Sequence, residues 1–166
     1  MRSTPSLSLR ASTVDDTLAV AAALAGLARA GDVVLLAGEM GTGKTTFAQG
    51  FGRAMGVDEP ITSPTFTLVH SYPTAGPTLH HADLYRLEHM SEVADLALGE
   101  LAEFHGIVLV EWGDVAAGAF GDHVVVRLGH VDGDDAARTV VLTAVGGAWA
   151  RRWGALVEAT AEWCDQ

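Results

Sequence analysis

Short apolar runs separated by longer mixed segments recur along this chain of 166 residues. The runs at 33–37 and 107–110 are continuously apolar, which is typical of strands buried on both faces. A helix over 45–55 follows the first run, and a short helix over 91–98, which continues as a broken helix to 104, precedes the second. Strands that alternate with helices in this way predict a mixed α/β fold with a largely parallel sheet.

The flanking regions predict further elements. Residues 7–11 alternate weakly, as an edge strand does, and Ser12 or Thr13 then caps a helix that ends at Gly31. Near the C-terminus, 124–128 and 138–145 bracket a turn rich in Gly and Asp over 129–135, which predicts an antiparallel hairpin. Apolar residues at helical spacing, including two tryptophans, predict one final helix over 147–163.

The first of the two buried runs leads into Gly38-x-x-x-x-Gly43-Lys44-Thr45, the pattern of a phosphate-binding P-loop. A strand precedes the pattern and a helix over 45–55 follows it, with Gly56 as its C-cap. Lys44 is the only lysine in the chain, whereas the other nine cationic residues are arginines. We expect the nucleotide to contact the following loop residues: Glu39, Met40, Gly41, Thr42, Gly43, Lys44, Thr45 and Thr46.

Two acidic residues stand where predicted strands end. Glu111 follows the apolar run 107–110, as in a Walker-B strand, and Asp83 ends the strand predicted over 79–83. With the Thr45 hydroxyl, both carboxylates are candidate Mg²⁺ ligands, and Glu111 is also a candidate to orient the attacking water. His81 shares a strand face with Asp83, but we interpret His80, His81 and His89 as surface or capping residues, and a zinc site is disfavoured.

The segment 61–72 predicts a hydroxyl-rich loop that becomes a strand. Within it, Thr65 follows Ser63-Pro64 and is a candidate sensor of the γ-phosphate, the third catalytic candidate beside Lys44 and Glu111. A plain proline turn before an edge strand is an equally good interpretation. No arginine stands out as a finger, since Arg53 and Arg86 are candidates only by charge.

These features together predict an α/β, P-loop NTPase-like three-layer fold, with a mostly parallel central sheet and an antiparallel hairpin near the C-terminus. We expect one domain over residues 1–166. The net charge of −11 disfavours direct binding of nucleic acid, and the single cysteine, Cys164, suggests a reducing compartment. The N-terminus lacks a signal core and the alanine-rich run 18–30 is too short to span a bilayer, so a cytoplasmic protein is expected.

Four motifs in this order resemble the bacterial TsaE (YjeE) family. They are Gly38-Glu-Met-Gly-Thr-Gly-Lys-Thr-Thr-Phe47, Thr62-Ser-Pro-Thr-Phe-Thr-Leu-Val69, His81-Ala-Asp-Leu-Tyr-Arg-Leu87 and Val110-Glu-Trp112. The resemblance covers about residues 10–145. It departs at Glu39, where the family usually has Asp, and in a longer C-terminal segment.

The resemblance implies a weak ATPase that uses ATP and Mg²⁺ and is stimulated by partner proteins. It would act on a TsaB–TsaD complex, which attaches threonylcarbamoyl to the adenosine next to the anticodon in tRNAs that read ANN codons. The chain would meet tRNA only through that complex, and no membrane. Two alternatives remain open from the residues: a small-molecule kinase, and a nucleotide-dependent assembly switch without significant turnover.

Overall fold

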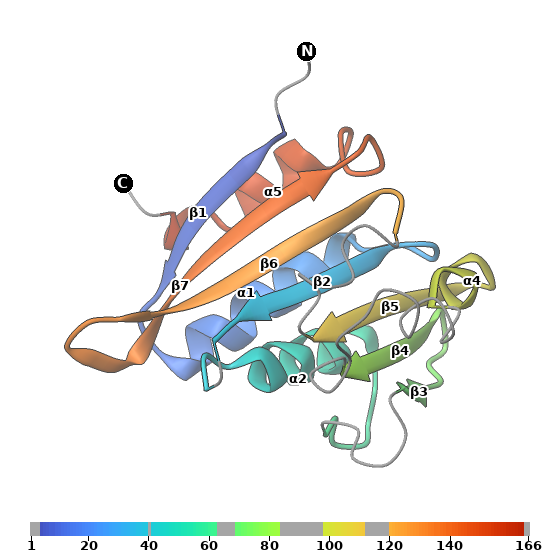
Figure 1. Cartoon of the computed structure of the whole chain (residues 1–166), viewed down its shortest axis with the longest axis horizontal. Coiled ribbons are helices and arrows are strands. Elements are labelled where there is room, and N and C mark those ends of the chain that lie inside the picture. The colour runs from blue at the N-terminus through green and yellow to red at the C-terminus, as the bar shows by residue number, and fades with distance from the viewer. Residues whose placement is uncertain (1–3, 40, 63–68, 84–97, 112–119, 165–166) are drawn as a thin grey trace.

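A seven-stranded sheet organises the computed structural model, which describes residues 4–39, 41–62, 69–83, 98–111 and 120–164 (Figure 1). The strand order is β1-β7-β6-β2-β5-β4-β3. The strands are β1 (Ser6–Ala11), β2 (Val33–Gly38), β3 (Val69–Tyr72), β4 (Thr78–Asp83), β5 (Gly106–Glu111), β6 (His123–Val131) and β7 (Asp134–Val145).

The centre of the sheet is parallel and its outer parts are antiparallel. β2 runs parallel to β5 on one side and to β6 on the other, and β4 runs parallel to β5. The pairs β1–β7, β6–β7 and β3–β4 are antiparallel, which confirms the mixed sheet, the C-terminal hairpin and the edge strand β1. The parallel pairing brings the carboxyl ends of β2, β4, β5 and β6 to one edge.

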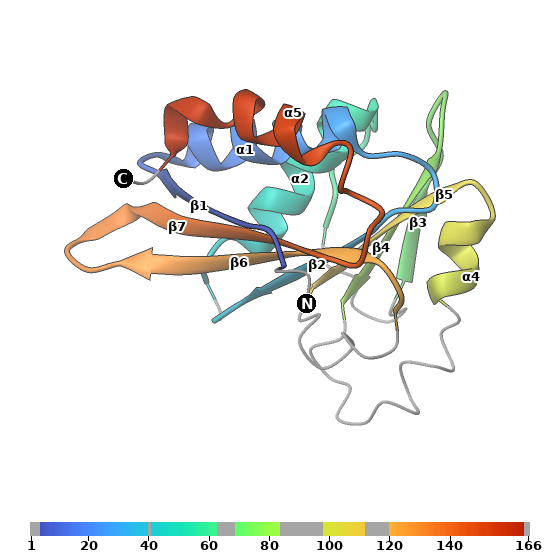
Figure 2. The same ribbon diagram turned by 90° about the horizontal axis from the view of Figure 1, so that it is seen from above.

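Helices cover the two faces of the sheet unequally. In Figure 2, α1 (Val14–Leu27), α2 (Lys44–Met55) and α5 (Trp153–Ala159) lie together on one face. On the opposite face α4 (Leu98–Glu103) packs through Ala102 against Val108 and Val110 of β5. None of the helices within the described ranges has the length and apolar character needed to cross a bilayer.

The two long helices approach each other closely. A Cβ atom on Gly50 of α2 would stand 2.8 Å from the Leu18 carbonyl oxygen of α1, so only glycine permits this contact. Thr13 caps α1, because its hydroxyl accepts a hydrogen bond from the Asp16 N–H at 3.1 Å. The cap that the sequence places at Ser12 or Thr13 is therefore at Thr13.

The β6–β7 hairpin is longer and its turn tighter than the sequence predicts. Both strands continue through the Gly/Asp-rich segment, so the turn is only Asp132-Gly133, with Gly133 at φ 80°. Of the two turn residues only Gly133 has positive φ, which glycine adopts without the steric cost that a side chain brings. The hairpin consequently extends beyond the end of β2, where Gly38 pairs with Leu128.

The single C-terminal helix expected over 147–163 is wrong. The chain instead makes tight turns, then the seven-residue helix α5, then a 3₁₀ turn over Ala161–Trp163. Thr160 ends α5: its hydroxyl donates to the Leu156 carbonyl at 2.8 Å, a bond that competes with helix continuation. The segment then returns to the N-terminal part, where the Trp163 indole N–H donates to Asp16 at 3.3 Å.

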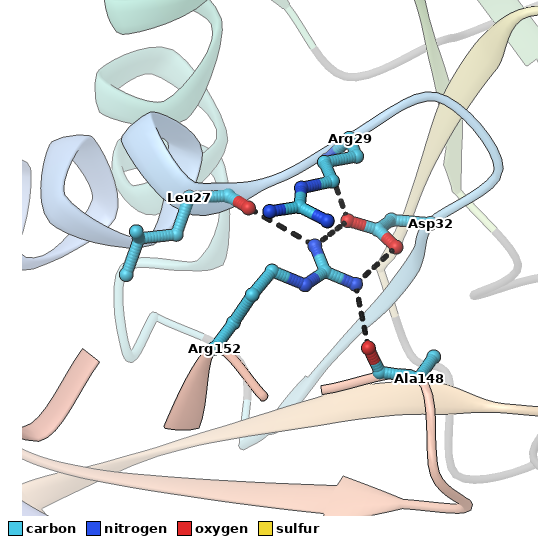
Figure 3. Close-up of polar contacts among 5 residues, drawn as sticks. All are labelled: Leu27, Arg29, Asp32, Ala148 and Arg152. Carbon is cyan, nitrogen blue, oxygen red and sulfur yellow. Dashed lines mark hydrogen bonds and ion pairs between the residues drawn. The ribbon is translucent and has the colours of Figure 1, made fainter. Parts of the chain in front are cut away.

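A buried ion pair explains where the C-terminal segment docks (Figure 3). The Arg152 guanidinium contacts both carboxylate oxygens of Asp32, at 2.6 and 3.0 Å, and lies 3.9 Å from the centre of the Trp149 ring. It also donates to the carbonyls of Leu27 and Ala148, each at 3.0 Å. Asp32 immediately precedes β2, so Arg152 fixes the point at which the P-loop strand enters the sheet.

Candidate functional site

The loop between β2 and α2 has the backbone of a phosphate cradle. Gly38, Gly41 and Gly43 all have positive φ, at 144°, 82° and 98°. A Cβ atom on Gly38 would meet the carbonyl oxygen of Leu128 on β6, so the close approach of the two strands requires glycine here. Gly43 precedes α2 without any side-chain cap, which leaves the first N–H groups of the helix to an anion.

Lys44 is folded over this loop. Its ammonium donates to the carbonyls of Gly38 at 2.8 Å and Glu39 at 2.9 Å, and the residue is 6% exposed. Burial lowers the pKa of Lys44 below 10.5, and the negative charges of Glu111 and Asp83 oppose that shift. The only lysine of the chain is thus held at the loop and in the field of two carboxylates.

The structure brings the predicted metal ligands to the same edge of the sheet. Glu111 ends β5 and Asp83 ends β4, and the two residues are paired in register. At the start of α2, the Thr45 hydroxyl donates to Oε1 of Glu111 at 3.1 Å. Thr46 follows in the same helical turn and is partly buried.

The two histidines of β4 are buried, which corrects their interpretation as surface or capping residues. His81 is fully buried, and its Nε2 lies 2.6 Å from Oε2 of Glu111. His80 points to the other face, where its Nδ1 is bonded to the Ser71 hydroxyl at 2.7 Å, and burial lowers the pKa of its ring. The sequence feature that points to a role for His81 is its position two residues before Asp83, which puts it on the strand face that carries both carboxylates.

The donor set at this edge suits magnesium. Thr45, Asp83 and Glu111 offer only oxygen atoms, and three protein groups leave coordination positions for phosphate oxygens and water. In the part of the chain that the structure describes, no group of three or more His, Cys, Asp and Glu side chains is placed to hold a metal ion. An ion here would therefore depend on a bound polyphosphate for several of its ligands.

A hollow of about 640 Å³ lies on the other side of the loop. Gly38, Glu39 and Thr42 form one of its walls, and residues of β6 and β7, among them Arg127 and Thr139, form the other. Since β6 and β5 flank β2 on opposite sides, the hollow and the carboxylates lie to either side of the P-loop strand.

Arg138 is a residue of this region that sequence reasoning missed. From β7 its Nε donates to the Thr42 carbonyl at 2.9 Å and its Nη2 to the Gly41 carbonyl at 3.4 Å. It thereby ties the β6–β7 hairpin to the loop between β2 and α2. No local sequence pattern predicts this contact, because it joins residues 96 positions apart.

Other predicted residues do not join the site or lie outside the described part. Arg53 is exposed in the last turn of α2, at the opposite end of the helix from the loop, so it is not a finger within this chain. The candidates Met40, Thr65 and Arg86 fall outside the described residues. Their roles stay predictions.

Comparison with known proteins places this geometry in a family. The model of the family described as threonylcarbamoyl adenosine biosynthesis protein TsaE matches residues 11–140. The chain is 38% identical to the TsaE protein of Bacillus subtilis over 132 residues, 80% of this chain and 82% of that one. It is 40% identical to the TsaE protein of Streptomyces coelicolor over 133 residues, 76% of this chain and 89% of that one.

A solved structure agrees with the sequence relatives. The crystal structure of Bacillus subtilis YdiB superposes with a TM-score of 0.74 at 30% identity and covers 98% of both chains. The shared fold therefore includes the C-terminal segment beyond the residues that the family model matches. The chain belongs to the TsaE family of threonylcarbamoyl adenosine biosynthesis proteins.

Proposed function

We propose that this protein is an ATP-binding and ATP-hydrolysing accessory protein for threonylcarbamoyladenosine modification of tRNA. One observation carries the proposal: Lys44, Thr45, Asp83 and Glu111 converge at the carboxyl edge of a parallel sheet, around a loop shaped for phosphate. The family membership supplies the pathway. The acidic surface supports an indirect role, in which a partner holds the RNA.

Each residue has a distinct task in this proposal. The loop N–H groups and the α2 N-terminus bind the phosphates, and Lys44 contacts the β- and γ-oxygens. Thr45 and Asp83 would hold Mg²⁺, which when bound neutralises charge on those oxygens. Glu111 orients the attacking water or contacts the ion through water, and Thr65 responds to the γ-phosphate.

The positions of these groups orient the nucleotide. The two carboxylates proposed to hold Mg²⁺ end β4 and β5, so the γ end of a triphosphate would point toward those strands. The nucleoside end then points the other way, toward the hollow between the loop and the β6–β7 hairpin. We propose that the ribose and base occupy this hollow.

Filling the hollow is therefore expected to weaken binding of ATP and leave binding of phosphate alone unchanged. With Thr139→Trp on β7, we expect the Kd for ATP to rise at least about 10-fold, because the indole takes the space of the nucleoside. The Kd for inorganic tripolyphosphate, which lacks a nucleoside, should stay within about twofold. Calorimetric titration measures both. Thr143→Trp, on the same strand and outside the hollow, is the control. If Thr139→Trp weakened the binding of ATP and of tripolyphosphate equally, the nucleoside would not occupy this hollow.

We expect slow ATP hydrolysis by the isolated protein and faster hydrolysis with purified TsaB and TsaD. If a partner supplies the arginine finger, that arginine can accelerate such a reaction about 10³–10⁵-fold, and the isolated chain lacks this contribution. Turnover is measured with and without the partners, and Glu111→Ala is expected to lower the stimulated rate about 100-fold or more. Equal turnover with and without the partners would refute the stimulated ATPase.

Phosphate transfer and tRNA modification, measured beside ATP turnover, separate the two alternatives. A small-molecule kinase would transfer the γ-phosphate to a metabolite in the absence of TsaB and TsaD. An assembly switch would bind its partners in a nucleotide-dependent way and support repeated rounds of tRNA modification after Glu111→Ala. Loss of modification together with hydrolysis in that variant supports the ATPase.

A further inference from the structure

The buried pair of His81 and Glu111 has a defined geometry. Nε2 of His81 lies 2.6 Å from Oε2 of Glu111, and the side chains are 0% and 4% exposed. Carboxylate oxygens accept, so the imidazole N–H is on Nε2 and donates. Within the described residues Nδ1 of His81 has no partner, so the bond to Glu111 is the one polar anchor of the ring there.

The two oxygens of Glu111 thus have different partners. Oε2 faces His81 inside the sheet, while Oε1 faces the Thr45 hydroxyl at the start of α2. A glutamate side chain has three rotatable bonds and takes many orientations when nothing holds it. Fixing Oε2 from behind leaves Oε1 directed at the side of the site where the phosphates are proposed to bind.

We propose that His81 is a positioning residue, which holds the Glu111 carboxylate so that Oε1 stays directed at the site of hydrolysis. The inference rests on the proposed ATPase function and adds a residue to it. His81 touches neither nucleotide nor phosphate in this scheme, because it is buried behind Glu111. Its effect should therefore appear in the rate of hydrolysis and not in nucleotide affinity.

Three variants separate hydrogen bonding from packing. The amide nitrogen of Gln reaches about as far as Nε2 of histidine, whereas that of Asn reaches only about as far as Nδ1. We expect His81→Asn and His81→Leu to lower the stimulated kcat about 10- to 100-fold, the range found when a partner of a functional carboxylate is removed. His81→Gln should recover most of the rate. In all three the Kd for ATP should stay within about threefold.

Two controls test whether the effect runs through Glu111. His80→Asn changes the neighbouring histidine, which is bonded to Ser71 on the other face of the sheet, and should leave kcat unchanged. In a Glu111→Ala background, His81→Asn should have no further effect on kcat, because the group that it positions is gone. Circular dichroism and melting of each variant show that it is folded.

A measurement without nucleotide tests the bond itself. In protein labelled with ¹⁵N-histidine, we expect a downfield Nε2–H proton signal from His81, which moves upfield in Glu111→Ala. Wild-type kcat in folded His81→Asn, additive effects in the Glu111→Ala background, or no such signal would overturn the inference alone. A wild type that hydrolyses no ATP with its partners would refute the proposed function, and the positioning role with it.

Discussion

Replacing Lys44 by alanine is expected to weaken binding of ATP at least about 100-fold while the fold is retained. The ammonium is the one side-chain cation within the loop, and bonds to charged groups contribute about 1.5–3 kcal/mol each. The fold should survive because the lost bonds are to two loop carbonyls, which water can then reach. Calorimetric titration measures the affinity and circular dichroism the helix content.

Because the Lys44 ammonium must be charged to bind phosphate, the affinity for triphosphate should depend on pH. Burial holds the pKa of Lys44 in the free protein below 10.5, so affinity for triphosphate should fall once the pH rises through that lowered value. Arg53→Ala, at the far end of α2, is the matched control and should bind ATP as the wild type does. Unchanged affinity in Lys44→Ala would show that triphosphate does not bind at this loop.

Breaking the Arg152–Asp32 pair is expected to have the largest effect on stability. Arg152→Met leaves the Asp32 carboxylate buried without its guanidinium, and loss of one partner of a buried pair costs about 3–5 kcal/mol. The cation–π contact with Trp149 and the bonds to Leu27 and Ala148 are lost with it. Urea denaturation measures the free energy of unfolding.

The neighbouring residue provides a control for this experiment. Arg151 is exposed, so Arg151→Met should change the free energy of unfolding by less than about 0.5 kcal/mol. Adding Asp32→Asn to Arg152→Met should recover part of the loss, because the remaining buried group then carries no charge. A single Arg152→Met variant as stable as the Arg151→Met variant would show that the Arg152–Asp32 pair does not stabilise the fold.

The sequence predicts the parts of the site that follow from local patterns. The P-loop is a contiguous motif, and Glu111 and Asp83 each end a predicted strand, so parallel pairing alone brings them to the same edge as the loop. Thr45 is placed by the motif itself. These predictions need only the periodicity of strands and the rule that parallel strands end at one edge.

The parts that the sequence does not predict depend on contacts between distant residues. His81 meets Glu111 across 30 positions, and Arg138 meets Thr42 across 96. Apolar residues at helical spacing predict a C-terminal helix that is too long. In the structure α5 begins only after Arg152, whose side chain turns inward and binds Asp32. Such pairings are decided by tertiary packing, which overrides local propensity.

A crystal structure with a non-hydrolysable ATP analogue and Mn²⁺, whose anomalous signal locates the ion, tests the central claim most directly. We predict the triphosphate on the Gly38–Thr45 loop with Lys44 on its oxygens, and the ion beside Thr45, Asp83 and Glu111. An analogue bound elsewhere, or an ion remote from these carboxylates, would contradict the account.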